Sequence, residues 1–211
     1  MNHPSRRGFT LLELIIVIAI LAILSVAVIL VINPAETLAR ARDSQRFSDL
    51  AAIKSSIGLY LSQVSPPDMD GGGSCATNAW IASASPITAG TLCTIGFAAV
   101  LGEGAGASAI DGTGWVPVNL TSIPVSIGAP LSNYPLDPNP LVTLTEPADT
   151  DRTYVYRCLN AASENTFEIN TNLESQLYTA GAQNKEDSDG GNNTGLYEIG
   201  TDPGLDLCNT W

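Results

Sequence analysis

The chain has 211 residues and a net charge of -12, which is enough length for one ordinary domain plus an anchoring segment. Beyond Lys54 the only basic residues are Arg152, Arg157 and Lys185, so the C-terminal part is acidic. Such a surface repels nucleic acid, so we expect no nucleic-acid partner; the acidity suits solvation or cation binding. The single histidine, His3, precedes a long apolar run. It lies in what looks like a removable leader, and without it the chain contains no histidine. This excludes Ser-His-Asp catalysis, Cys-His catalysis and His-ligated zinc, and we predict that the chain is not an enzyme.

An apolar segment covers residues 9–32, with Thr10, Glu13 and Ser25 as its only polar side chains. A helix of about 24 residues is roughly 36 Å long and can span a bilayer. Two arginines precede it, which favours a cytoplasmic N-terminus with the remainder translocated. A secretory signal peptide would have a shorter apolar region. We expect the hydroxyls of Thr10 and Ser25 to bond to their own helix backbone. The Glu13 carboxylate is different, because placing a carboxylate in hydrocarbon costs about 2–4 kcal/mol and such residues usually mark function.

The stretch RRGFTLLELIIVIAILAIL resembles the N-terminus of type IV pilins and type II secretion pseudopilins. The resemblance implies a leader over residues 1–8, cleavage by the prepilin peptidase between Gly8 and Phe9, and N-methylation of Phe9. It also implies that the inner-membrane assembly platform moves the helix out of the membrane and into a homo-oligomeric filament. There Glu13 would set the register by neutralising the Phe9 amine of a neighbouring subunit.

A second helix is predicted within residues 33–65. Pro34 should interrupt the apolar helix with a kink or a melted turn, because proline removes a backbone hydrogen bond. Apolar residues follow at spacings of three and four and should pack on a sheet: Leu50, Ile53, Ile57, Leu61 and Val64. Four basic residues are interpreted either as contacts to acidic neighbouring subunits or as a solvated face: Arg40, Arg42, Arg46 and Lys54.

Residues 66–140, rich in small residues, are predicted as a long connection from helix to sheet. Three half-buried strands are predicted within residues 141–211, in RTYVYRCL, TFEIN and GLYEIG, with a C-terminal loop. The fold class is therefore α+β, a long N-terminal helix packed on a small antiparallel sheet, which is the pilin-like arrangement that the resemblance implies.

Four cysteines follow the apolar segment without CxxC spacing, and in an exported chain they predict two disulfides. Three pairings are possible. We expect Cys75 and Cys93 to close a loop in the connection. Cys158 and Cys208 would then tether the C-terminal tail, a counterpart of the C-terminal disulfide in many pilins.

One acidic stretch, DSDGGNNTGLYE, partly matches the spacing of a calcium loop. Major pseudopilins bind calcium in an acidic loop near the C-terminus, so calcium is the one ligand predicted, although none is required. The alternative is a solvated acidic turn. The candidate ligands are Asp187, Asp189, Glu198 and Asp202, and DMDGG, residues 68–72, is a weaker second candidate.

These observations predict a structural subunit of a type IV pilus that serves adhesion, motility or surface attachment. Before assembly it would span the inner membrane once, N-in and C-out; afterwards it would belong to an extracellular or periplasmic filament. One alternative is a type II secretion pseudopilin with a calcium loop. Another, of a different class, is a membrane-anchored extracellular binding module.

Overall fold

The computed structural model places two units along the chain, Met1–Leu38 and Ala39–Trp211, and their fold class is α+β as predicted. It describes residues 8–76, 78–81, 91–92, 97–101, 107–140, 152–161, 164–202 and 204–208. Each unit is treated by itself below.

Helix α1, Leu11–Ile32, begins directly after Thr10, whose side chain caps its first turn. The Thr10 hydroxyl accepts a bond from the Glu13 backbone N–H, so our prediction of an interior hydroxyl at Thr10 was wrong: the residue has extended backbone before the first turn. Ser25 behaves as predicted and donates to the Leu21 carbonyl at 2.7 Å. Polar side chains in α1 are therefore used locally.

The two long helices meet at Asn33. This residue has a left-handed φ of 44° and ends α1, and Pro34 occupies the first position of α2, Pro34–Gln63. Proline suits that position because the first N–H groups of a helix have no intrahelical acceptor. The Asn33 side chain accepts a bond from the Glu36 N–H at 3.4 Å, so Asn33 closes one helix and caps the next.

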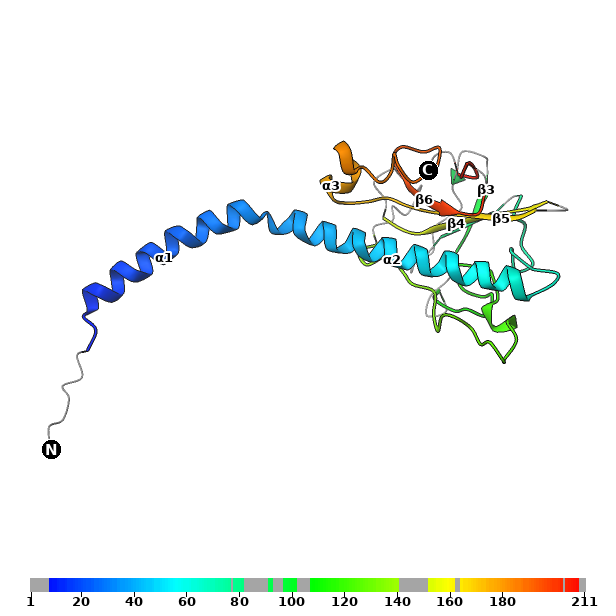
Figure 1. The fold of residues 1–211 in the computed structure, drawn as a ribbon, viewed down its shortest axis with the longest axis horizontal. Coiled ribbons are helices and arrows are strands. Elements are labelled where there is room, and N and C mark those ends of the chain that lie inside the picture. Colours follow the sequence, from blue (N-terminus) through cyan, green and yellow to red (C-terminus); the bar gives the residue numbers. More distant parts are fainter. Residues whose placement is uncertain are drawn as a thin grey trace, which may run out of the picture. The chain divides into compact units, whose positions relative to one another are not determined.

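From Ala39 onward, α2 lies along the sheet (Figure 1) and buries one stripe. Its C-terminal part contributes Leu50, Ile53 and Ile57, all fully buried, to the hydrophobic core. The turns before them bury charged residues on the same stripe, Asp43, Arg46 and Asp49. The predicted spacing thus identified the packed face, but the face is apolar over only part of its length.

The sheet has six strands in the order β2-β3-β1-β4-β5-β6. The predicted three are β4, β5 and β6, and they pair antiparallel. Strand β1 adds to β4 antiparallel and to β3 parallel, and β2 pairs with β3. The bounds are β1 Asn78–Ile81, β2 Thr91–Leu92, β3 Phe97–Leu101, β4 Val155–Ala161, β5 Glu164–Thr171 and β6 Tyr197–Gly200.

Our prediction of an irregular connection over residues 66–140 was wrong for β1, β2 and β3. Sequences of small residues there lack the alternation that marks a half-buried strand. Pairing with neighbouring strands decides their conformation instead: β1 pairs with β4, β3 with β1, and β2 with β3. Shorter elements complete the described chain: the 3-10 turns η2 Leu120–Ser122 and η3 Gly181–Gln183, and helix α3 Gln176–Thr179.

The two faces of the sheet differ in chemistry. Tyr156 on β4 lies opposite Ile169 on β5, and both join the core beneath α2. On the other face, Glu168 on β5 lies opposite Arg157 on β4, and both are buried. The sheet therefore has an apolar face toward α2 and a buried polar face away from it.

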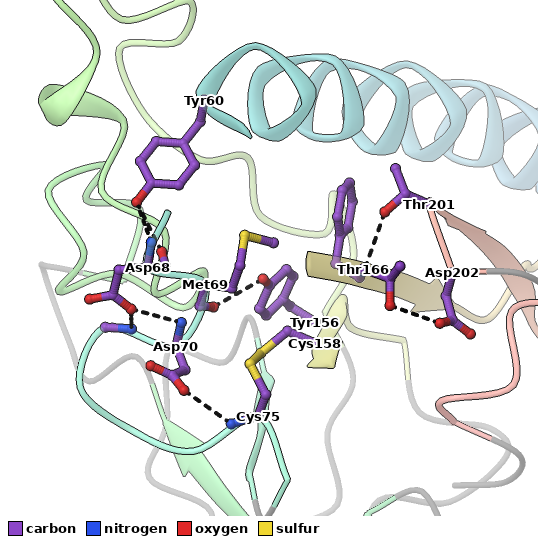
Figure 2. Close-up of a disulfide and its surroundings, with 12 residues drawn as sticks. Tyr60, Asp68, Met69, Asp70, Cys75, Tyr156, Cys158, Thr166, Thr201 and Asp202 are labelled. Atoms are coloured by element: carbon purple, nitrogen blue, oxygen red, sulfur yellow. Dashed lines mark hydrogen bonds between the residues drawn. A yellow bond between two sulfur atoms is a disulfide. The ribbon is translucent and has the colours of Figure 1, made fainter. Parts of the chain in front are cut away.

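A disulfide joins Cys75 to Cys158, residues 83 apart in the chain (Figure 2). The expected pairing of Cys158 with Cys208 was therefore wrong, as was that of Cys75 with Cys93. The residues around Cys75 fold back over the sheet, where the Tyr156 hydroxyl donates to the Met69 carbonyl. Cys208 is also disulfide-bonded, and Cys93 lies outside the described residues.

Candidate processing and assembly site

The predicted cleavage point lies in accessible backbone ahead of α1. Gly8, Phe9 and Thr10 belong to no helix or strand, and Phe9 is 83% exposed. Apart from its chain neighbours, no atom of the described residues lies within 4 Å of where a Cβ on Gly8 would stand. The Gly8–Phe9 peptide is thus open to a peptidase without unfolding the chain.

Glu13 lies in the first turn of α1 and forms a capping box with Thr10. Its Oε2 accepts a bond from the Thr10 N–H at 3.4 Å, while the Thr10 Oγ1 accepts from the Glu13 N–H at 3.2 Å. A carboxylate here also complements the positive end of the helix dipole. The described chain therefore gives Glu13 a local role, and the predicted pairing with a neighbouring amine stays a prediction because it needs a second subunit.

The surface of α1 is apolar on all sides. Its large apolar side chains that the structure describes are 47% to 76% exposed, from Val17 to Leu11. A helix of this kind is stable only when something else covers it. Among the described residues, no helix is both long and apolar enough to cross a membrane.

A buried ion network fixes the N-terminal part of α2 within the second unit. Arg46 donates to both carboxylate oxygens of Asp137 at 2.7 and 2.8 Å, to Asp43 at 2.7 Å and to Glu174 at 2.6 Å. Burial alone would raise the pKa of Glu174, but hydrogen bonds from Arg42 and Arg46 outweigh it and lower the pKa to about 2. Arg46 therefore serves neither of its predicted roles: it is an internal contact.

The sequence YPLDP supplies the partner of that network. The Asp137 carboxylate accepts hydrogen bonds from the Arg46 guanidinium. The Tyr134 hydroxyl donates to the Val118 carbonyl at 2.9 Å, and the indole N–H of Trp115 donates to the Pro135 carbonyl at 3.0 Å. The Asp137–Arg46 contact holds this part of the connection between β3 and β4 against α2, and the other two bonds fix it to residues 115–118. The available sequence signal for this contact was that Arg46 lies on the helical stripe that continues into Leu50, Ile53 and Ile57, where a charge needs a partner.

The predicted calcium ligands lie in the loop before β6, in β6 and just after it, and their carboxylates already accept protein hydrogen bonds. Asp189 accepts from the backbone N–H groups of Gly191 at 2.9 Å and Glu198 at 2.7 Å. Asp187 accepts from Asn184, and Asp202 accepts from Thr166. Within the part of the chain that the structure describes, no three His, Cys, Asp or Glu side chains gather into a group that could hold a metal ion. The calcium site stays a prediction.

Glu198 is the one predicted ligand that is fully buried, and it lies beside Glu168. Both carboxyl groups lie on the polar face of the sheet, where β5 pairs with β6, and both are buried. Burial, and after it the nearby carboxylates Glu168 and Asp189, raise the pKa of Glu198 to about 8. The site therefore favours the neutral form of this carboxyl group. Sequence reasoning missed Glu168, because one acidic residue in an alternating strand predicts a solvent-facing position.

Comparison with known proteins identifies the N-terminal segment. Residues 3–29 match the prokaryotic N-terminal methylation motif, a finding consistent with the type IV pilin and pseudopilin family and with the resemblance drawn from the sequence. The match covers Gly8, Phe9 and Glu13. No curated protein and no solved structure matches the chain.

Proposed function

We propose that this chain is a precursor subunit of a type IV pilus filament. In this proposal the prepilin peptidase removes residues 1–8, the new Phe9 amine is methylated, and copies of α1 pack together in the filament core. The assembled filament serves adhesion, motility or surface attachment. The chain has a structural role and performs no catalysis.

The observation that carries the proposal is the position of the methylation motif on an apolar helix whose described large side chains are exposed within the first unit. Every large apolar side chain described in α1 is about half exposed or more. Burying such a surface is worth about 25 cal/mol for each Å² removed from water. A lipid bilayer before assembly and a bundle of α1 helices afterwards both provide that burial, which supports a membrane-resident precursor.

The polar face of the sheet favours a second candidate within the same class. Glu198 Oε1 is buried without a hydrogen-bond partner among the described residues, as is Asn170 Oδ1 on the neighbouring strand. Oxygen atoms of this kind suit a calcium ion, and a calcium loop would make the chain a type II secretion pseudopilin. Calorimetry of calcium binding to the full chain in detergent separates the two: heat at millimolar calcium favours the pseudopilin, and no heat favours the pilus.

Processing is tested by expressing the full chain with and without a prepilin peptidase and measuring its intact mass. We expect the mass of residues 1–8 to be lost only when the peptidase is present. Gly8→Lys is the matched control, since Gly8 has open space around it and the larger side chain disturbs recognition and not the fold. A chain that keeps residues 1–8 with an active peptidase contradicts the proposal.

A further inference from the structure

An exposed apolar turn lies in the connection between β3 and β4, over residues 124–136. Val125 is 98% exposed, Ile127 49% and Leu136 38%. In the described loops of the second unit, these three are the most exposed large apolar side chains. Leu159, near the end of strand β4, is also exposed. Nothing within the described chain covers Val125.

The turn is built and anchored. The N–H groups of Ile127 and Gly128 both donate to the Pro124 carbonyl, at 2.8 and 3.0 Å, and Gly128 has the positive φ of 79° that closes such a turn. Ile123 beside it is only 3% exposed and joins the hydrophobic core. Val125 is thus presented from a fixed base.

Charge sets this turn apart from the rest of the unit. Between Asp111 and Asp137 the sequence contains no charged residue, and Asp137 itself is buried against Arg46. By contrast, nearly all of the 21 acidic residues belong to the second unit, since only Glu13 and Glu36 precede Ala39. The turn is an uncharged, apolar surface on a strongly acidic body.

We propose that the turn at residues 124–136 contacts a second copy of this chain within the filament, an inference that rests on the proposed function. Acidic bodies repel each other within a Debye length of about 8–10 Å, so two copies can touch only where carboxylates are absent. A basic protein would be drawn to the carboxylates instead, and an anionic lipid surface would be repelled. An equally acidic copy is the partner that this uncharged surface fits.

Three apolar side chains cover far less than the roughly 1,000 Å² that a stable interface needs. The turn therefore does not join two free subunits. It contributes once packing of α1 has raised the effective concentration of neighbouring copies. A head-to-tail contact of this kind, repeated from copy to copy, extends a filament without closing it into a ring.

The test uses the full chain in a host that assembles it, with a photocrosslinking amino acid, benzoylphenylalanine, placed at Val125. Irradiated filaments should yield an adduct of two copies of the chain. The same probe at Ala180, which is also exposed, serves as the matched control and should yield less. An adduct with a different protein, with lipid, or none at all in normal filaments overturns the inference.

A substitution gives an independent measurement. Val125→Asp should reduce polymer about tenfold or more, because each assembled copy would bury a carboxylate without a counter-charge. Val125→Thr, which replaces only a methyl group of that side chain, should assemble normally. Ala180→Asp, which adds a charge outside the turn, should also assemble normally. The two controls show that the effect of Val125→Asp comes from burying a charge at the turn. Normal filaments from Val125→Asp overturn the inference and leave the proposed function intact; a wild-type chain that forms no filaments overturns both.

Discussion

Glu13 has two candidate roles, and substitution of the capping box separates them. The structure shows the carboxylate capping its own helix, whereas the proposed function requires its charge to neutralise the amine of a neighbouring Phe9. Glu13→Gln keeps a capping group, since glutamine also serves in a capping box, but removes the charge. Thr10→Ala removes the cap and keeps the charge.

The two roles differ in size. The capping bonds are 3.2 and 3.4 Å long and exposed, so losing the Thr10 cap should cost the helix about 0.5–1 kcal/mol. An unpaired charge in an apolar bundle costs about 3–5 kcal/mol, which is roughly a hundredfold to a few thousandfold in incorporation. Glu13→Gln should therefore be helical but almost absent from filaments, and Thr10→Ala should be slightly less helical yet still assemble.

Helicity by circular dichroism in detergent and the amount of subunit in sheared filaments are the two assays. Both variants should still reach the membrane and lose residues 1–8, because neither changes the cleavage point. If Glu13→Gln filaments match the wild type, or if Thr10→Ala is the variant that fails to assemble, Glu13 acts through its cap and the charge argument is refuted.

Three further predictions concern the second unit. Arg46→Met leaves buried carboxylates without their counter-charge, so unfolding should become easier by about 3–5 kcal/mol, with Tm roughly 6–20 °C lower by calorimetry; a shift below 2 °C contradicts the network. Because the pKa of Glu198 rises from 4.5 to about 8 in the fold, the native chain holds a proton that the unfolded chain releases, and stability should fall as pH rises from 4.5 to 8. Glu198→Gln should flatten that slope, and an unchanged slope assigns it to other groups. Peptide mapping without reduction should recover Cys75 linked to Cys158, and replacing both by alanine should cost about 2–5 kcal/mol; a peptide linking Cys75 to Cys93 would exclude the pairing.

The features of the fold that the sequence predicted correctly were those that recur at a regular spacing along the chain. The spacing of Leu50, Ile53 and Ile57 identified the buried stripe of α2, and alternation identified β4 and β5. Both patterns depend on local geometry alone, so they survive without knowledge of the neighbours.

Features that depend on pairing between distant segments were missed. Strand β1 exists because it pairs with β4, and the disulfide joins Cys75 to a residue 83 positions away. Neither segment carries a local signal of its partner, and cysteine spacing leaves all three connectivities open. Arg46 was likewise expected to face either a neighbouring subunit or solvent, whereas it pairs with Asp137 inside its own chain.

At the candidate site, residue types sufficed for the motif but not for the contacts. The residues alone sufficed to find the methylation motif, whose match includes Gly8, Phe9 and Glu13, because the signature is local to the N-terminus. The cap between Thr10 and Glu13 was missed, since the helix was expected to begin at Phe9 and not after Thr10. A start two residues later turns an interior hydroxyl into an N-cap.

Intact mass and N-terminal sequencing of the chain in filaments sheared from its host would test the central claim most directly. The account predicts a chain that begins at N-methylated Phe9 and has all four cysteines oxidised. A chain that retains residues 1–8 and is found only in membranes would contradict it, and would identify the acidic second unit as an anchored binding module.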